Sequence, residues 1–479
     1  MALHREGLGI GSLPYKYLVA TAFICGLFID ILDATIVNVA LPTIGRELHA
    51  GNDTLEWIVT GYLLSLAIWI PASGWVGDRF GTKRSFMFAL AVFVLASALC
   101  GLAWDSGSLI AFRILQGVGG GMLTPVGTAM VFRAFAPEER PQASIVIAVP
   151  AIVAPVIGPL LGGWLTDTVG WRWIFFVNLP IGLAAFLFTW RYIREHVDEH
   201  AGRFDPWGFA LSGAGLALVL YSLSRGPAES WGPTVLGAGL IGLACSVLLF
   251  VVELRLPKPM LDLRLLGDRM FRGANFTNIL ATAALMGMLF TLPLFLQQFR
   301  GLSALESGLT SFPQALGLVA IMPVAGALYK KTGPRRLILV GLSGAAVTAA
   351  LFVLVDGRTD LWLIRGLLFV RGLTLGLALL PLQTTTFATI SFAETGRASA
   401  LFNTARQVAA SLGVAILATV LVAQQRLATG DELRGFHDAF VAGTVLSVLA
   451  VVAGLLIRDE DALYSVASRR TLSRAPGEA

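Results

Sequence analysis

Two aspartates interrupt the first long apolar stretch of the chain, FIDILDATIVNVALP. Asp30 and Asp33 are three residues apart, so their side chains share one face of a helix. Loss of hydration and mutual repulsion disfavour the doubly ionised pair, and this favours proton binding near neutral pH. The alternative is that both acids pair with an arginine and only hold helices together. The pattern therefore predicts either a proton-binding site or a structural ion pair.

The composition around these acids is that of a membrane protein. Of 479 residues, 56% are hydrophobic and 14% are charged, and the mean hydropathy is +0.76. Soluble domains carry about 25% charged residues, so a soluble globular protein is excluded. Cys25, Cys100 and Cys245 lie singly in apolar stretches, which favours neither a disulfide framework nor a metal site. No P-loop motif and no soluble domain long enough to hold a nucleotide are present, so we expect that ATP does not drive this protein. No metal set or pair of nucleophile and base stands out, so we expect no cofactor and no enzymatic activity.

Apolar windows of about 20 residues, the length that crosses a bilayer, recur along the whole chain. They predict an all-α integral membrane protein with fourteen spans. The expected spans are 17–41, 54–76, 85–104, 108–131, 142–166, 172–193, 207–224, 233–254, 273–297, 307–329, 337–355, 361–382, 400–423 and 436–457.

The orientation of the spans follows from the basic residues. Most of the 35 Lys and Arg residues fall in the two tails and in alternate connections, which the positive-inside rule places in the cytoplasm. We therefore expect a multi-pass protein of the cell (cytoplasmic) membrane with both termini cytoplasmic. The net charge of +5 and the pI near 9.3 then report topology and contact with the lipid bilayer, and no nucleic acid partner is expected.

Arg113, in the fourth predicted span, is the natural partner of Asp33. The first span runs outward and the fourth runs inward, so Asp33 and Arg113 lie roughly 12 and 8 Å from the outer ends of their helices. At these compatible depths Arg113 is expected to contact Asp33, with Gln116 as a polar neighbour.

An internal repeat divides the chain. The segment GWVGDRFGTKR returns as GALYKKTGPRR, and each copy lies between the second and third spans of its half. This predicts two six-helix bundles related as parallel repeats, at 1–193 and 256–457. The connector 194–255 supplies two additional transmembrane helices, and 458–479 is a cytoplasmic tail. The matched positions are Gly74 with Gly326, Gly81 with Gly333, Lys83 with Arg335 and Arg84 with Arg336.

Five motifs in this order resemble those of the major facilitator superfamily, and within it of the drug:proton antiporter family with fourteen spanning helices. Ala154 and Lys330 depart from the family pattern, and Lys330 leaves a charge-relay role of the second basic turn in doubt. The motifs are LDATIVNVALPTI (32–44), GWVGDRFGTKR (74–84), RILQGVGGG (113–121), APVIGPLLGG (154–163) and ASALFNTARQVAASLGVAI (398–416).

The resemblance implies a major facilitator fold and assigns roles to residues. Asp33 lies in the first-span motif, so it is a stronger candidate for proton coupling than Asp30. The resemblance places the first and fourth spans around the central cavity, so Arg113 is expected to sense or displace the proton on Asp33; a fixed structural ion pair is the alternative. The basic turn is expected to act as a conformational switch through Gly74, Asp78, Arg79, Gly81, Lys83 and Arg84. The fifth span is expected to be the antiporter helix, sealing and hinging between the bundles at Gly158, Pro159, Gly162 and Gly163; ordinary helix packing is the alternative.

A substrate cavity is expected where polar and adaptable apolar side chains face the bundle centre. The alternative for the Met and Phe positions is lipid-facing or core surface. The candidates are Asn38, Gln116, Asn278, Met286, Phe290 and Arg371.

Together these features predict a proton-coupled transmembrane exporter of hydrophobic or cationic drugs that works by alternating access. The expected partners are a small-molecule substrate and protons, and the protein is expected to be monomeric. An exporter of one specific lipid or metabolite on the same fold is the first alternative. A transport-inactive membrane sensor or scaffold is an alternative of another class.

Overall fold

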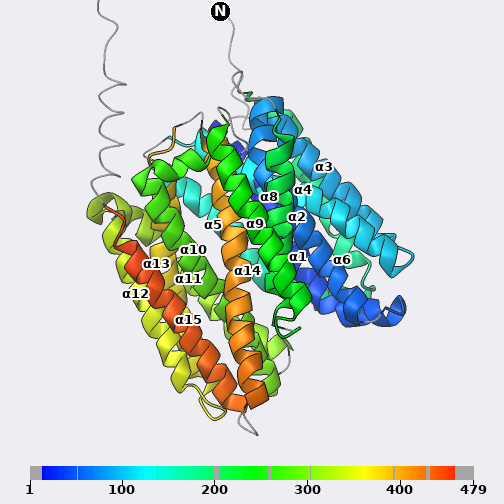
Figure 1. The fold of residues 1–479 in the computed structure, drawn as a ribbon, viewed down its shortest axis with the longest axis vertical. Helices are drawn as coiled ribbons and strands as arrows, with labels where there is room; N and C mark the ends of the chain where they lie inside the picture. The colour runs from blue at the N-terminus through cyan, green and yellow to red at the C-terminus, as the bar shows by residue number, and fades with distance from the viewer. Residues whose placement is uncertain are drawn as a thin grey trace, which may run out of the picture.

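The computed structural model describes residues 13–458 except 51, 137–138, 198–203, 228, 257–260, 303, 392–393 and 428–431. Every regular element in this part of the chain is a helix (Figure 1). The α-helices are α1 (Tyr15–Glu47), α2 (Asn52–Phe80), α3 (Thr82–Gly101), α4 (Ser106–Ala134), α5 (Arg140–Thr168), α6 (Trp173–Phe176), α7 (Asn178–Tyr192), α8 (Pro206–Arg225), α9 (Pro233–Arg255), α10 (Arg269–Leu294), α11 (Ala304–Thr332), α12 (Pro334–Leu351), α13 (Leu361–Thr386), α14 (Thr395–Leu427) and α15 (Glu432–Gly454).

The helices account for the predicted membrane spans. Thirteen segments within the described residues are long and apolar enough to cross a membrane, one of them formed by α6 and α7 together. The 29-residue helix α5 occupies the place of the fifth predicted span. Most helices run past the apolar windows because backbone hydrogen bonding continues to a capping residue. At α4, for example, Asp105 and Ser108 form a capping box.

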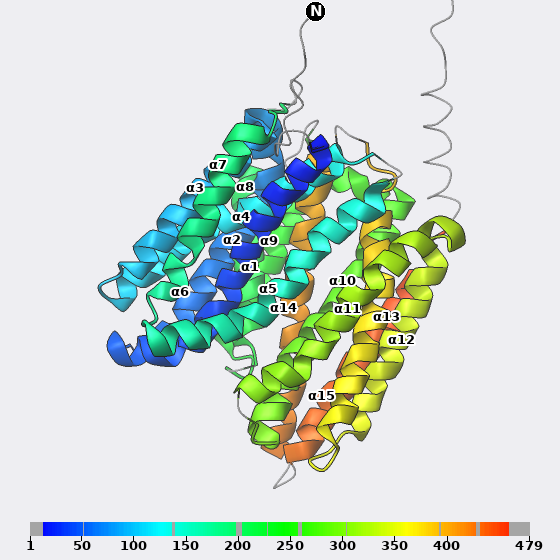
Figure 2. The ribbon, with the colours of Figure 1, turned by 180° about the vertical axis from the view of Figure 1, so that it is seen from behind.

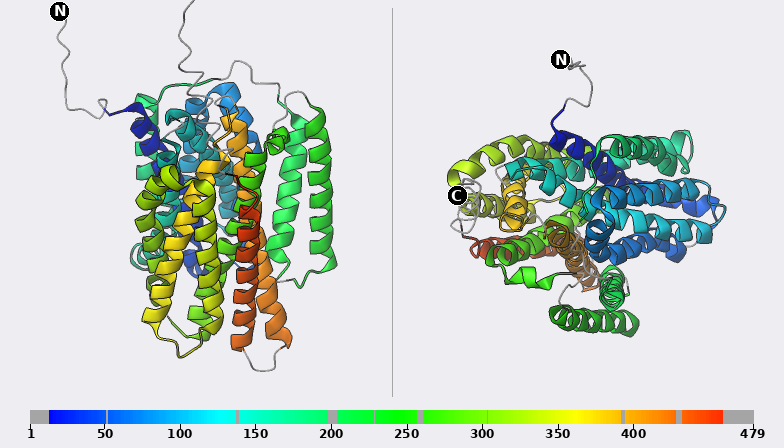
Figure 3. Two further views of the ribbon diagram at one scale, coloured as in Figure 1. Left: turned by 90° about the vertical axis from the view of Figure 1, so that its left-hand side faces the viewer. Right: turned by 90° about the horizontal axis from the view of Figure 1, so that it is seen from above.

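Two groups of helices pack side by side (Figures 1 and 2). Helices α1 to α7 pack mainly on one another, and α10 to α15 do the same, so we call these groups the N bundle and the C bundle. The predicted division at residues 193 and 256 stays a prediction, but the packing follows it. Helices α8 and α9 form a hairpin at the edge of the assembly, where α8 lies on α2 (Figure 3).

The bundles meet at the end of the helices where α1 begins and α15 ends, which we call the termini end. Ser144 on α5 and Thr384 on α13 share a hydrogen bond of 2.9 Å there. Close by, the rings of Phe132 on α4 and Phe387 stack with centroids 4.4 Å apart. Ser399 on α14 donates to the Pro125 carbonyl oxygen at 2.8 Å. These contacts join the two bundles near the termini end of α4, α5, α13 and α14.

The two copies of the repeated turn have the same backbone geometry. Gly81 precedes α3 with φ +96° and ψ 142°, and Gly333 precedes α12 with φ 78° and ψ 161°. A side chain is strained at such positive φ values, so glycine is required at both turns. The matched conformation supports the parallel repeat that the sequence predicts.

Candidate functional site

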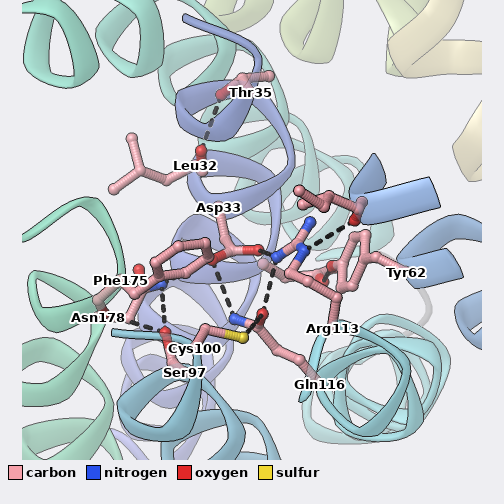
Figure 4. Close-up of polar contacts among 12 residues, drawn as sticks. Leu32, Asp33, Thr35, Tyr62, Ser97, Cys100, Arg113, Gln116, Phe175 and Asn178 are labelled. Atoms are coloured by element: carbon pink, nitrogen blue, oxygen red, sulfur yellow. Dashed lines mark hydrogen bonds and ion pairs between the residues drawn. The ribbon is translucent and has the colours of Figure 1, made fainter. Parts of the chain in front are cut away.

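Asp33 and Arg113 form a buried ion pair between α1 and α4. The Asp33 carboxylate has no solvent exposure, and the Arg113 side chain is 1% exposed. Gln116 Nε2 and Asn178 Nδ2 each donate to Asp33 Oδ1 at 2.9 Å. Figure 4 shows Asp33, Arg113, Gln116 and Asn178 converging from α1, α4 and α7. The depth estimate that placed Asp33 opposite Arg113 agrees with this contact.

Arg113 has further partners that hold its guanidinium in place. Its Nη1 donates to Gln116 Oε1 at 2.7 Å, and its Nε donates to the Ile58 carbonyl oxygen at 3.2 Å. Its Cζ lies 4.2 Å from the centroid of the Tyr62 ring, which is a cation–π distance. The guanidinium therefore has contacts that do not depend on Asp33.

Glycines bring the neighbouring helices close to this site. A Cβ atom at Gly158 on α5 would collide with Thr35, and one at Gly162 would lie 2.7 Å from the Ile36 side chain. Both contacts fall within three residues of Asp33 on α1. Helix α5 therefore packs directly on the segment that carries Asp33, which places the predicted antiporter helix beside the ion pair.

Asp30 lies one turn from Asp33 but has different surroundings. Its side chain is 6% exposed, and it accepts hydrogen bonds from Tyr62 Oη at 2.6 Å and from Thr124 Oγ1 at 3.2 Å. A Cβ at Gly120 would lie 2.7 Å from Asp30 Oδ1, so glycine leaves room for this carboxylate. Across the bundle interface, the half-buried Arg406 on α14 interacts electrostatically with Asp30.

The predicted substrate-cavity residues have different environments. Gln116 is part of the Asp33 site. Asn278 is 6% exposed, and its Nδ2 has no hydrogen-bond partner among the described residues, whereas Met286 is half-buried and Phe290 is 37% exposed. Arg371 is 1% exposed and donates to the Ala345 carbonyl oxygen at 3.4 Å. Asn38 belongs to α1, but its side chain lies outside the described residues.

The basic turn between α2 and α3 touches both bundles. Asp78 pairs with Arg133 at 2.8 Å and lies against Gly396 in the first turn of α14. A carboxylate at a helix N-terminus is stabilised by the helix dipole. A Cβ at Gly74 would lie 3.0 Å from the Gly396 carbonyl oxygen, so the turn packs closely on α14.

Gly81, Lys83 and Arg84 contact the last turn of α7 and the segment that follows it. Lys83 Nζ donates to the Trp190 carbonyl oxygen at 2.8 Å, and the backbone amides of Lys83 and Arg84 donate to the Glu195 carboxylate. Gly81 also packs on Glu195. Arg79 is exposed.

Gly163 and Pro159 are the other two residues predicted on the antiporter helix. Gly163 is half-buried. The side chain of Pro159 lies outside the described residues, although its backbone belongs to α5. The close contacts with α1 that the structure describes are those of Gly158 and Gly162.

Four residues of the site were not predicted from the sequence: Tyr62, Thr124, Asn178 and Arg406. Asn178 had the clearest signal, because it is an amide within a predicted span and is followed by Pro180. In the structure it begins α7 after the break at Val177. Its Nδ2 also donates to Ser97 Oγ at 3.0 Å, which fixes the amide between α1 and α3.

The fold defines a multi-pass helical membrane protein built from two helical bundles, with a buried ion pair inside the N bundle. A family model described as the Major Facilitator Superfamily matches residues 23–414. The chain therefore belongs to the Major Facilitator Superfamily of membrane transporters.

Several relatives are similar over most of their length. The chain is 36% identical to a multidrug resistance protein B homolog of Mycobacterium tuberculosis, covering 85% of this chain and 77% of that protein. It is 31% identical to the multidrug export protein EmrB of Haemophilus influenzae (83% and 79%) and 31% identical to a putative multidrug resistance protein MdtD of Pectobacterium carotovorum (89% and 92%).

A solved structure supports the same fold. The crystal structure of the human organic anion transporter MFSD10 (TETRAN) matches with a TM-score of 0.69 and 18% sequence identity. The match covers 92% of this chain and 100% of that one. At this identity the likeness shows the fold alone.

Proposed function

We propose that this protein is a proton-coupled exporter of hydrophobic or cationic drugs in the cell membrane, with both termini cytoplasmic. The observation that carries the proposal is the Asp33–Arg113 ion pair, a buried acid whose carboxylate is held by charged and amide donors from α4 and α7. A buried ionisable pair in a membrane protein is expensive, and such residues generally serve transport. The protein acts as a transporter and not as an enzyme, and it works as a monomer.

Proton coupling follows from what protonation does to this pair. A proton on Asp33 removes the negative charge that faces Arg113, so the ion pair is lost. Arg113 keeps its contacts to Ile58, Gln116 and Tyr62, which offer the guanidinium a second stable arrangement. Protonated and ionised Asp33 thus favour different conformations, and a substrate that prefers one of them is coupled to the proton.

The proposed conformational change breaks the contacts between the bundles near the termini end. Ser144, Thr384 and Ser399 join the bundles there by hydrogen bonds that must break for this end to open. Asp78 of the basic turn lies against the first turn of α14. Its carboxylate is attracted by the dipole at this helix N-terminus, which links the basic turn to the C bundle. Rocking of one bundle against the other would then expose the site alternately to the two sides.

The drug class of the substrate is supported by the names of the relatives. The proteins of Mycobacterium tuberculosis and Haemophilus influenzae described above are named as multidrug resistance and export proteins. Arg371 and Asn278 are the polar groups of the C bundle proposed to contact substrate, and Met286 and Phe290 supply an adaptable apolar surface.

The experiment uses everted membrane vesicles with an imposed pH gradient, acid inside. Lipophilic cations and neutral drugs are added in turn, and proton release is followed with a pH-sensitive dye for wild type and Asp33→Asn. We expect several compounds to collapse the gradient in wild type and none to do so in the variant. Collapse by Asp33→Asn equal to wild type would refute coupling through Asp33.

Asp105→Asn is the matched control. Asp105 is an exposed N-cap of α4, and asparagine caps helices as well as aspartate does. This control loses one carboxylate outside the buried site and should respond as wild type. If no compound acts on the folded wild-type protein, multidrug export is wrong, and a panel of lipids and metabolites tests the specialised exporter.

A further inference from the structure

Arg371 is a buried cation near the middle of α13, in the C bundle. Its side chain is 1% exposed. Its guanidinium donates to the Ala345 carbonyl oxygen on α12 at 3.4 Å, which is long for an N–H···O bond. Among the described residues, no other group accepts a hydrogen bond from this guanidinium, and no acid lies within 4.0 Å of it. Within this part of the chain, the charge of Arg371 therefore has no counter-ion.

The internal repeat shows how the two bundles differ at this point. By the register of the repeated turns, Leu285 on α10 corresponds to Asp33, the paired acid of the N bundle. Arg371 corresponds to Gly119 on α4. A Cβ at Gly119 would lie 2.7 Å from the amide nitrogen of Phe93 on α3, so glycine allows those two helices to touch. The C bundle therefore gains a buried arginine at one position and has a leucine where the N bundle has its acid.

Glycines, and not Arg371, set how closely α12 and α13 pack. A Cβ at Gly341 would lie 2.6 Å from the Thr374 carbonyl oxygen, and one at Gly344 would lie 2.5 Å from the Thr374 side chain. Neither this packing nor an ion pair within the described residues accounts for the arginine. Because a buried charge is expensive in a membrane protein, such a residue is expected to serve ligand binding.

An apolar cluster lies beside the guanidinium. Leu375 is one turn from Arg371 on the same face of α13. It belongs to a buried cluster with three residues of α11 and α12, namely Leu318, Met322 and Ala345. Ile145 of α5 packs against this cluster from the N bundle, next in sequence to Ser144, whose hydrogen bond joins the bundles. In the proposed opening of the termini end, α5 leaves the cluster and a ligand can reach the guanidinium.

We propose that Arg371 binds the anionic oxygen group, a carboxylate or a phosphate, of an amphiphilic molecule whose apolar part lies on this cluster. This rests on the proposed function, which places Arg371 among the substrate contacts, and it extends the substrate class to amphiphilic anions. A guanidinium presents N–H donors in a planar fork that matches two oxygens of such a group. The bound anion is then the counter-ion of Arg371.

The test compares two probes that share an apolar body, naphthaleneacetate and its neutral counterpart naphthaleneethanol. Their affinities for the purified full chain in phosphatidylcholine nanodiscs are measured by calorimetry, and the heats of empty nanodiscs are subtracted. Arg371→Gln should weaken naphthaleneacetate binding about tenfold, as expected for the loss of hydrogen bonds to a charged group, and change naphthaleneethanol binding less than about twofold.

Thermal unfolding separates ligand binding from a structural role. Arg371→Gln removes a buried charge that has no counter-ion, so its melting temperature without ligand should be no lower than that of wild type. Naphthaleneacetate should raise the melting temperature of wild type and leave that of Arg371→Gln unchanged. Arg365→Gln is the matched control, because Arg365 is a half-buried arginine of the same helix that stacks on Trp362. It should bind both probes as wild type does.

The source of the anionic group is distinguished in detergent, where phosphatidylglycerol replaces naphthaleneacetate as the added probe. If phosphatidylglycerol raises the melting temperature of wild type but not of Arg371→Gln, the site takes a lipid phosphate. If only naphthaleneacetate does so, the site takes a soluble carboxylate.

Three outcomes would overturn the anion site. They are equal binding of naphthaleneacetate by wild type and Arg371→Gln, an equal loss of affinity for both probes, and a melting temperature of Arg371→Gln below that of wild type. The site is also wrong if neither naphthaleneacetate nor phosphatidylglycerol acts on wild type. In each case drug-dependent proton release in vesicles still decides the proposed function, which fails only if no drug collapses the gradient.

Discussion

Asp30 and Asp33 occupy adjacent turns of α1, yet Asp33 forms an ion pair with an arginine, whereas Asp30 accepts hydrogen bonds from the hydroxyl groups of Tyr62 and Thr124. Asp33 pairs with Arg113 on α4. Asp30 interacts electrostatically with Arg406 on α14. A change at Asp33 therefore removes a buried ion pair, whereas a change at Asp30 removes hydrogen bonds from two neutral hydroxyl groups.

The ion pair predicts a strongly non-additive effect on stability. Asp33→Asn or Arg113→Gln alone leaves a buried charge without its partner, which costs about 3 kcal/mol in the free energy of unfolding. The double variant Asp33→Asn/Arg113→Gln removes both charges and should be more stable than Arg113→Gln alone. Unfolding of the purified protein in detergent by increasing SDS measures this. Additive losses would mean that the two charges do not stabilise each other.

The packing of α5 on α1 predicts which glycine cannot be replaced. Gly158→Val places side-chain atoms on Thr35, so α5 must move away from the segment of Asp33. We expect a lower melting temperature and loss of drug-dependent proton release in vesicles. Gly237→Val on α9 is the matched control, since no atom lies within 4 Å of a Cβ built there. Equal effects of both substitutions would contradict the close approach at Gly158.

The contact between the bundles predicts a reversible lock. Ser144 and Thr384 are hydrogen-bonded at 2.9 Å, so cysteines at both positions are near enough to form a disulfide. In a background without Cys25, Cys100 and Cys245, oxidation of this pair should abolish transport, and reduction should restore it. Each single cysteine serves as a control. Full transport by the oxidised double variant would mean that the bundles need not separate here.

The N-cap of α4 predicts an acid-sensitive contribution to stability. Asp105 accepts a hydrogen bond from the Ser108 amide at 2.7 Å, and this lowers the pKa of the Asp105 carboxyl. A lowered folded-state pKa stabilises the protein above the unfolded-state pKa, and that stability is lost as the pH falls through the folded-state pKa. Asp105→Ala should lower the melting temperature at neutral pH, and the difference from wild type should shrink in acid. A difference that does not change with pH would exclude the ionised cap.

Several parts of the fold could be predicted from single stretches of sequence. Apolar length alone determines where helices cross the membrane, because every backbone polar group there must be bonded within its own helix. The helical break at Val177 within the sixth span was missed, because apolar length marks a span but not an interruption of the helix within it. The glycine turns before α3 and α12 were predicted as a pair, because the same local conformation needs the same residue in each half.

The sequence by itself determined the candidate acids, the paired turns and the match between Asp33 and Arg113, because rare charges in apolar helices stand out and helix length sets their depth. Only the tertiary structure decided that Asn178 and Tyr62 complete the site and that Thr124 donates to Asp30. Those relationships depend on which helix faces meet and on the rotation of each helix about its axis. Packing between helices distant in sequence sets these rotations, and no local pattern of residues encodes them.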